Sequence, residues 1–453
     1  MSRARLARVG RGLGWQGVIA GSAVALAAAV AGSAVALAAA VAGAPPAEAA
    51  TTGVGTAMGT AGARTAGSGA AGAGTAGSAT AGAGTSGPAT AGTATGASAC
   101  SKAAGPFSVS GTQVIGADGK PFVSYGLTVP GLQGTDWAGL VMLDLAKIAA
   151  TANDWCANTV RLQLNQDFLL GPGGTRFNQA YMAAIKSEVA LAEYYKLVVV
   201  LNDETNFGPP AAQNLQRGPT PGTETFWKDL AKVYGNDPQV IFDLFNEPRM
   251  YSAGTSQAQE WHLWLDGGTF RGVSYPFGMA QLAAYVRNTV GARNLFWIEG
   301  PNWSASFAGM VQEGALLEVS GVVYALHHPA GQPDTASWDA DFGYLVFGGI
   351  APVVDGEWTN YEPAPTAYPT PPRSSCWPDA PTRVPQFLQY LAGYGIGLNA
   401  YSLQPGYLIR SYSNMALPTT INPKTWTCRS SQEPQPGQGA GSQVLKWFEQ
   451  QNG

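Results

Sequence analysis

Eight short apolar runs, separated by longer segments of helical periodicity, constrain the fold of this chain more than any other feature. Each run is rich in β-branched and aromatic residues and poor in charge, which is typical of strands that are buried on both faces. The runs lie at residues 122–129, 158–164, 197–203, 240–246, 294–300, 321–328, 351–358 and 395–403. The segments between them, such as 178–195 and 279–290, carry apolar residues at helical spacing.

Eight alternating strand and helix units predict an α/β fold, a (β/α)8 TIM barrel. The alternative is a doubly wound open sheet, which usually carries a glycine-rich phosphate-binding turn after its first strand. The first run continues as SYGLTVPG (124–131), which contains no such turn, so we favour the barrel. Residues 107–126 precede or overlap this run and predict a β-hairpin with its turn at Asp118–Gly119. We expect this N-terminal hairpin to close the bottom of the barrel.

The first 99 residues have the composition of a leader and a linker. Four arginines occur within the first 11 residues, residues 17–43 carry no charge, and Ala47–Glu48–Ala49 matches a signal-peptidase site. We therefore predict a signal peptide at 1–49. The apolar segment repeats AGSAVALAAAV at 20–30 and 31–41, and this length leaves an uncleaved membrane anchor as the alternative. Residues 50–99 are mostly Ala, Gly, Thr and Ser and predict a flexible linker, so that the catalytic barrel would occupy 100–453.

The net charge bears on nucleic-acid binding, and the cysteines bear on disulfides and metal sites. A net charge of −4, from 25 basic and 29 acidic residues, offers no basic surface for nucleic acid. The four cysteines of an exported chain are expected to form disulfides, and four cysteines allow three pairings. We favour Cys100 with Cys156 at the predicted barrel bottom, and Cys376 with Cys428 at the opposite face. No Cys/His spacing indicates a metal site.

Polar side chains gather where the predicted strands end. The fourth run ends in Asn246–Glu247–Pro248, the seventh ends in Glu357–Trp358, the second carries Arg161 and the sixth carries His327. The C-terminal ends of the strands form one rim of a barrel, and reactive groups lie at that rim. Two carboxylates across the barrel mouth suit cleavage of a glycosidic bond, because one can protonate the leaving oxygen while the other attacks the anomeric carbon.

The motifs FNEP (245–248) and GEW (356–358), at these strand ends and in this order, resemble the family 5 glycoside hydrolases, the cellulase family of clan A. The resemblance covers roughly residues 106–450 and includes DGKPF (118–122), TVRLQ (159–163), HH (327–328) and PGYLI (405–409). It implies that Glu247 is the general acid/base and Glu357 the nucleophile. It also implies that Asn246 holds the sugar 2-hydroxyl, that Arg161 keeps Glu357 ionised and that His327 lines the cleft.

The chain departs from the family pattern at three places. Glu204 stands where a His is expected after the third strand, Pro329 where a Tyr follows the sixth, and Tyr401 where a Trp follows the eighth. We expect Glu204 and Tyr401 to contact the sugar. A platform for the sugar ring is also expected from about two of four tryptophans. The four candidates are Trp303, Trp338, Trp358 and Trp377.

The sequence thus predicts a secreted, monomeric, retaining β-glycosidase that cleaves a β-linked glucan or mannan within the chain. No cofactor, metal or nucleic acid is expected, and membrane contact only if the leader stays uncleaved. The nearest alternative enzyme is a transglycosidase, in which another sugar intercepts the glycosyl-enzyme. The alternative from another class is a non-catalytic carbohydrate-binding protein on a decayed barrel.

Overall fold

The structure is a computed structural model that describes residues 100–171, 176–205, 217–250, 255–327, 334–360, 379–424 and 439–453. The predicted leader and linker, and the predicted pair Cys376–Cys428, lie outside the described residues. So do His328, Pro329 and Trp377.

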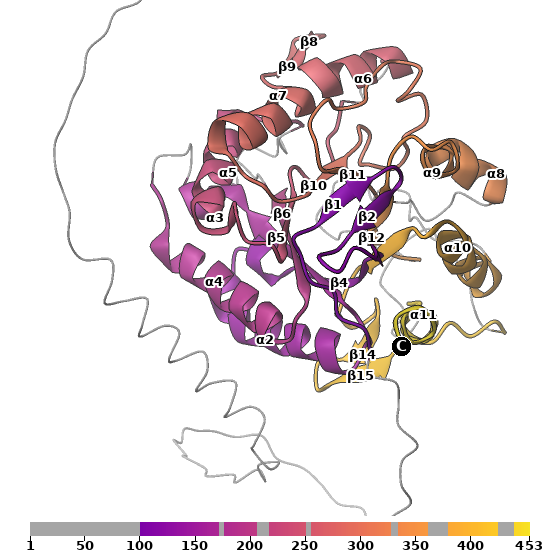
Figure 1. Ribbon diagram of the computed structural model, residues 1–453. Coiled ribbons are helices and arrows are strands. Elements are labelled where there is room, and N and C mark those ends of the chain that lie inside the picture. The colour runs from indigo at the N-terminus through magenta and orange to yellow at the C-terminus, as the bar shows by residue number, and fades with distance from the viewer. Residues whose placement is uncertain are drawn as a thin grey trace, which may run out of the picture. The chain divides into compact units, whose positions relative to one another are not determined.

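Eight parallel strands form a closed barrel in chain order, with the last strand paired to the first (Figure 1). The strands are β4 (Tyr125–Val129), β5 (Thr159–Asn165), β6 (Val198–Thr205), β7 (Val240–Asp243), β10 (Phe296–Glu299), β11 (Val322–Leu326), β12 (Val353–Trp358) and β13 (Gly397–Ala400). Each of the eight predicted runs coincides with one of them, and only β5 and β6 continue past the end of their runs, by one and two residues. The predicted (β/α)8 barrel is therefore confirmed.

Helices surround the strands on the outside (Figure 1). They are α2 (Trp137–Asn153), α3 (Gln166–Leu170), α4 (Gln179–Tyr194), α5 (Pro221–Tyr234), α6 (Gln257–Asp266), α7 (Met279–Ala284), α8 (Thr335–Trp338), α9 (Tyr344–Phe347), α10 (Ala380–Tyr394) and α11 (Gly441–Asn452). A short 3-10 turn, Gly131–Gln133, follows β4, and wider π turns occupy Tyr285–Val290 and Asp339–Gly343. None of the helices in the described part of the chain is long and apolar enough to cross a bilayer.

Helix α5 shows how the sequence builds this outer layer. Thr220 caps its first turn through its side-chain oxygen, and Pro221 occupies the first helical position, where its missing N–H costs nothing. Phe226, Trp227 and Leu230 lie on one helical face and are fully buried. The Trp227 indole N–H also donates to the Leu244 carbonyl at 2.8 Å, which ties the helix to the end of β7.

Alternation along the strands divides the apolar residues into two cores. In β6, Val199 and Leu201 belong to the cluster between the strands and the helices, whereas Val198 and Val200 belong to a second cluster. This second cluster fills the barrel and contains Val198, Val200, Ile241, Leu295, Trp297, Val323, Ala325 and Val354. Apolar side chains thus fill part of the barrel interior. The polar side chains lie closer to the C-terminal ends of the strands.

A three-stranded antiparallel meander, rather than a single hairpin, precedes the barrel. Its strands are β1 (Ser108–Ser110), β2 (Gln113–Ile115) and β3 (Pro121–Phe122). The expected turn at Asp118–Gly119 joins β2 to β3, and Gly119 adopts the left-handed φ of 76° that such a turn needs. Phe107, Val109, Val114 and Phe122 pack against the cluster inside the barrel.

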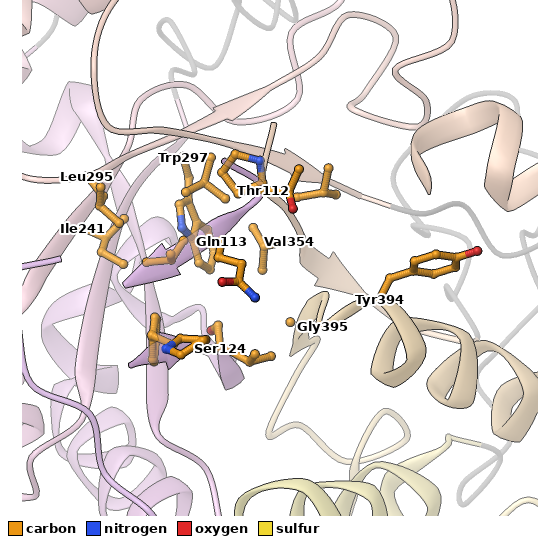
Figure 2. Close-up of a pocket in the computed structure, with 17 residues that line it drawn as sticks. Thr112, Gln113, Ser124, Ile241, Leu295, Trp297, Val354, Tyr394 and Gly395 are labelled. Carbon is orange, nitrogen blue, oxygen red and sulfur yellow. The ribbon is translucent and has the colours of Figure 1, made fainter. Parts of the chain in front are cut away.

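A disulfide, two small hairpins and a cavity lie outside the barrel strands. The predicted Cys100–Cys156 disulfide is confirmed. Two small hairpins that were not predicted lie outside the barrel, β8 (Gly268–Phe270) with β9 (Val273–Tyr275), and β14 (Ile409–Ser411) with β15 (Asn414–Pro418). A cavity lies between the meander and the barrel, lined by residues that include Gln113, Ile241, Leu295 and Trp297 (Figure 2). None of the predicted site residues lines this cavity.

Candidate active site

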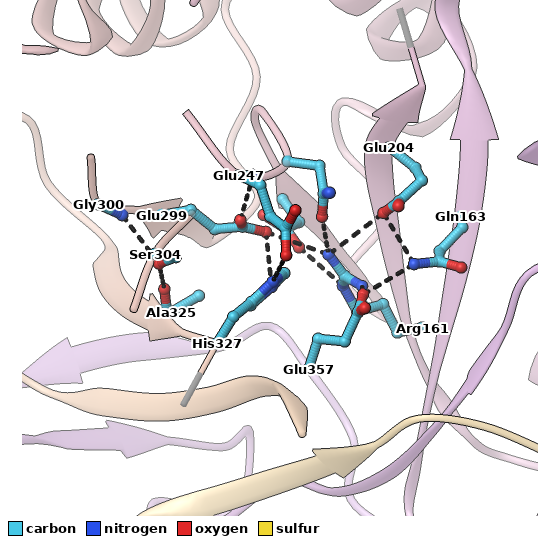
Figure 3. A network of polar contacts seen from close by, with 12 residues as sticks. Arg161, Gln163, Glu204, Glu247, Glu299, Gly300, Ser304, Ala325, His327 and Glu357 are labelled. Carbon is cyan, nitrogen blue, oxygen red and sulfur yellow. Dashed lines mark hydrogen bonds and ion pairs between the residues drawn. The ribbon is translucent and has the colours of Figure 1, made fainter. Parts of the chain in front are cut away.

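Arg161 forms the centre of a polar network inside the barrel (Figure 3). β5 places its side chain in the barrel interior, where it is fully buried. A buried cation is costly unless its donors are paired, and the guanidinium here meets four acceptors. Nε donates to Asp243 Oδ2 at 2.9 Å, Nη1 to Glu357 Oε2 at 2.5 Å, and Nη2 to Asn246 Oδ1 at 2.8 Å and to Glu299 Oε1 at 3.1 Å.

Glu357 enters this network from β12. The pairing of β12 with β13 shifts register between Asp355 and Trp358, so the strand is irregular where Glu357 lies. Its Oε2 accepts hydrogen bonds from Arg161 and from the side-chain amide of Gln163, the latter at 2.8 Å. Burial raises the pKa of Glu357, while the charges of Arg161 and His327 act in the opposite direction.

Glu247 faces Glu357 from the loop that follows β7. Its backbone adopts a left-handed φ of 46°, and its N–H donates to Glu299 Oε2 at 2.6 Å. Left-handed backbone is unfavourable for a residue with a side chain, so the surrounding contacts must hold it. One oxygen of Glu247, one oxygen of Glu357 and one ring nitrogen of His327 all lie within 4.8 Å of one another.

His327 follows β11 and lies between two carboxylates. Its Nδ1 is 3.2 Å from Glu247 Oε1, and its Nε2 is 3.0 Å from Glu299 Oε1. Burial alone would lower the pKa of the imidazole, but the negative charge of Glu299 and the contact with Glu247 outweigh it and raise the pKa well above its usual value. These two carboxylates therefore favour the protonated form of the imidazole.

The cluster contains more acidic groups than the two cations can balance. Asp243, Glu204, Glu247, Glu299 and Glu357 surround Arg161 and His327. Burial, followed by the neighbouring Glu299, raises the pKa of Asp243 to about 7. Burial, followed by the charge of Glu357, raises the pKa of Glu204 well above its usual value. The network therefore holds protons as well as charges at neutral pH.

Most of the predicted site residues come together at this rim. Glu204 accepts from the Gln163 amide at 2.8 Å and lies 3.9 Å from Arg161 Nη2. Tyr401, which follows β13, lies close enough that the charge of Glu357 adds to burial in raising the pKa of its hydroxyl. Trp303 is 43% exposed, and its backbone N–H donates to the Pro248 carbonyl beside Glu247.

Two of the four candidate sugar platforms are buried, and the assignment of Trp358 to the cleft is wrong. Trp358 is fully buried and stacks on Phe387 of α10, with ring centroids 5.9 Å apart. Trp338 is 1% exposed and packs edge-on against Phe387 and Tyr390. Neighbouring residues of a strand face opposite sides, so Trp358 packs outside the barrel because Glu357 points inside.

Three residues of the network were not predicted. Glu299 is the last residue of β10, much as Glu247 lies just after β7. A carboxylate that follows a buried apolar run was the sequence signal that could have identified it. Asp243 is a charge within a buried strand, which requires a partner. Gln163 lies two residues after Arg161 and therefore shares its face of β5.

A metal fits this arrangement poorly. Glu247, His327 and Glu357 are the one group of ligand-type side chains in the described ranges that is close enough to hold an ion. Both ring nitrogens of His327 already face carboxylates, Nδ1 towards Glu247 at 3.2 Å and Nε2 towards Glu299 at 3.0 Å. The Glu357 oxygen nearest Arg161 is also already paired with a cation.

Comparison with known proteins agrees with this geometry. The family model for cellulase (glycosyl hydrolase family 5) matches residues 115–404. Endoglucanase C of Evansella cellulosilytica is 31% identical over 144 residues, which are 30% of this chain and 16% of that protein. An endoglucanase of Paenibacillus polymyxa is 30% identical over 154 residues, 29% of this chain and 37% of that protein. The matches thus span well under half the length of these relatives.

Solved structures share the fold at low sequence identity. A β-glucanase of Saccharophagus degradans, solved in complex with cellotetraose, superposes with a TM-score of 0.51 at 19% identity, covering 71% of this chain and 91% of that one. An endocellulase of Pyrococcus horikoshii gives a TM-score of 0.50 at 15% identity, covering 67% and 92%. The barrel, the facing glutamates and a family model that matches more than half of the sequence lead to one conclusion: this chain belongs to glycosyl hydrolase family 5, the cellulase family.

Proposed function

We propose that this protein is a retaining β-glycosidase, with Glu357 as its nucleophile and Glu247 as its general acid/base. The distance between the two carboxylates carries the proposal. Their nearest oxygens lie within 4.8 Å, which agrees with the ~5–5.5 Å typical of retaining enzymes. Inverting enzymes need about 6.5–9.5 Å, because a water molecule must fit between the carboxylate and the sugar.

The neighbours of each glutamate support this assignment of roles. Arg161 and Gln163 both donate to Glu357, and such hydrogen bonds favour its ionised, nucleophilic form. The side chain of Glu247 is 36% exposed, against 19% for that of Glu357. Glu247 also lies beside His327, whose protonated form is favoured. A group at the open side of the pair can reach both a leaving oxygen and an incoming water.

The reaction would proceed in two displacements. A Glu357 oxygen attacks the anomeric carbon, the glycosidic C–O bond breaks, and Glu247 donates its proton to the departing oxygen. Glu247 then takes a proton from water as that water attacks the same carbon and releases Glu357. Arg161 donates to the side-chain oxygen Oδ1 of Asn246, so the Asn246 side-chain NH2 is oriented to donate to the sugar 2-hydroxyl.

We further propose that the substrate is a β-linked glucan, with mannan second, cut within the chain. The endoglucanases among the relatives support a glucan. Trp303 would stack on a sugar ring at the rim, and Tyr401 and Glu204 would contact the sugar bound nearer the carboxylates. The substrate would be met outside the cell by a secreted monomer, after removal of residues 1–49.

The N-terminal meander would close the bottom of the barrel in this proposal. The packing of Phe107, Val109, Val114 and Phe122 against the apolar cluster inside the barrel supports it. Water excluded from that end leaves the polar rim as the open end of the barrel.

Release of reducing sugar from a panel of β-glucans, mannan and xylan tests the proposed function. Wild type is compared with Glu357→Gln, and circular dichroism checks that both are folded. Activity of the wild type on one polymer, with loss of that activity in Glu357→Gln, is the expected result. A folded wild type that binds glucan but hydrolyses no polymer would favour the carbohydrate-binding protein, and longer oligosaccharide products would favour the transglycosidase.

A further inference from the structure

We propose that Gln163 is a positioning residue for the reaction: its side-chain amide holds one oxygen of Glu357 so that the other oxygen faces the sugar. This inference rests on the proposed function, because it assigns a task to Gln163 in the nucleophile's own site. It concerns a residue that carries no charge and makes no step of the reaction itself.

The Gln163 amide makes three hydrogen bonds, and Figure 3 shows it between Glu204 and Glu357. Its Nε2 donates to Glu204 Oε2 and to Glu357 Oε2, both at 2.8 Å. Its Oε1 accepts from Gln133 Nε2 at 3.1 Å. A flipped amide would point its oxygen at two carboxylates and its NH2 at another NH2, so the contacts determine the orientation.

The amide is also held rigidly in place. Gln163 is fully buried and belongs to β5, whose backbone pairs with both β4 and β6. Gln133, in the turn after β4, holds the oxygen end of the amide, and Glu204 on β6 accepts one of its two hydrogens. The remaining hydrogen can therefore point only at Glu357.

This contact complements that of Arg161. Arg161 Nη1 and Gln163 Nε2 reach the same atom, Glu357 Oε2, and neither contact uses Oε1. Two donors on one oxygen restrict rotation of the carboxylate and leave Oε1 as the attacking atom. Preorganisation of this kind lowers the barrier, because no reorientation is needed when the bond forms.

The groups that face Glu357 determine how loss of the amide would appear in a pH profile. They are Arg161 on β5, Glu204 on β6, Glu247 after β7, His327 after β11 and Tyr401 after β13. In Gln163→Leu the cations remain and one donor to the ionised form of Glu357 disappears. The pKa of Glu357 should then rise, since hydrogen bonds to a charged form favour that form.

The first test is Gln163→Leu, measured as kcat/KM against pH on the best polymer. We expect the acid limb, which reports ionisation of the nucleophile, to move up by about one pH unit. We expect kcat to fall by roughly tenfold to a hundredfold, with a smaller change in KM. A residue that only filled space would alter stability and leave the acid limb in place.

A second variant, Gln163→Glu, guards against loss of folding in the first. When protonated, the introduced carboxyl can still donate one O–H to Glu357, and when ionised it repels Glu357. Activity should therefore survive best at low pH, with the optimum shifted towards acid. Gln239→Leu is the matched control, since its amide is also hydrogen-bonded at both ends, donating to the Ala103 carbonyl and accepting from the Gly105 N–H, at the other end of the barrel. It should lower stability without moving the acid limb.

The outcomes separate this inference from the proposed function. Wild-type pH profiles in both Gln163 variants, with Glu357→Gln inactive, would overturn the inference alone, as would an equal shift in Gln239→Leu. If the wild type hydrolyses nothing, the proposed function fails. A 13C titration of the glutamate side chains tests the contact in either case: a higher Glu357 pKa in Gln163→Leu shows that the amide acts on Glu357, and an unchanged one overturns the inference.

Discussion

Arg161 contacts one of the two facing glutamates and His327 contacts the other, and these neighbours separate the roles we propose for them. A fixed guanidinium favours the ionised form of Glu357 at every pH at which the protein is folded. The imidazole beside Glu247 is favoured in its protonated form by the carboxylates on either side, and it contacts a group that must both give and take a proton. Two chemically identical side chains thus acquire different tasks from their surroundings.

Glu247→Ala tests the acid/base role. Without its proton donor, hydrolysis of a polysaccharide should fall about 10²–10⁴-fold in kcat/KM, because the sugar leaving group needs protonation. Aryl glycosides with an acidic phenol as leaving group should lose much less at the first displacement. Added azide should restore turnover by attacking the glycosyl-enzyme, with a β-glycosyl azide as product. An equal loss on both substrate types, with no azide product, would contradict the assignment.

Glu299 contacts both Arg161 and His327, so its charge should affect the pKa of His327. Glu299→Gln removes the largest charge that raises the His327 pKa, so this pKa should fall by about one unit or more. Histidine NMR can measure the shift, because the chain has only 3 His. His262, exposed on α6 beside Asp266, is the internal control, and its signals should be the same in both proteins. An unchanged His327 would show that Glu299 is not its main partner.

At the scale of elements, helices α2 and α4 contain a second buried acidic cluster. Glu188 of α4 is fully buried near Asp144 and Lys147 of α2, and these two form an ion pair at 2.9 Å. Burial, followed by the charge of Asp144, raises the pKa of Glu188 well above its usual value, against the opposing effect of Lys147. The folded protein therefore binds a proton at Glu188 that the unfolded chain releases above about pH 4.3.

This raised pKa makes stability depend on pH with a definite sign. The folded state binds more protons than the unfolded state above about pH 4.3, so stability falls as pH rises from there through the folded pKa. Glu188→Gln removes that dependence and should raise the thermal midpoint at about pH 8 by roughly 2 °C or more, with little effect near pH 4. Exposed Glu449 of α11 supplies the control, Glu449→Gln. A Glu188→Gln midpoint shift that is the same at both pH values would contradict this account.

The elements also show which parts of the molecule could be predicted. Buried parallel strands are rich in β-branched and aromatic residues, so all eight were found without knowledge of their partners. The meander was only partly predicted, because the turn dipeptide Ser110–Gly111, where Gly111 adopts a positive φ, was not interpreted as a first turn. Trp358 was assigned to the cleft beside Glu357 although successive residues of a strand face opposite ways. Glu299 and Gln163 were missed because their task depends on contacts between strands, which no single motif displays.

For the whole molecule, the Cys100–Cys156 disulfide joins the start of the described chain to the segment before β5. It closes a loop with a sequence separation of 56. A loop of this length restricts the unfolded chain strongly, so replacing both cysteines with serine should lower the free energy of unfolding by about 2–4 kcal/mol. Urea unfolding of the double variant measures this loss, and the m-value checks that the transition stays two-state. Unchanged stability would contradict a structural role for this disulfide.

The whole account depends on a covalent intermediate between the sugar and Glu357. A 2-deoxy-2-fluoro cellobioside with a good leaving group should form that intermediate and hydrolyse only slowly, and mass spectrometry of the intact protein and its peptides can locate the label. We predict one added glycosyl group, on the peptide that contains Glu357, and none in Glu357→Gln. A label on Glu204, Glu247 or Glu299, or activity on glucan without any label, would contradict the assignment of Glu357 as the nucleophile.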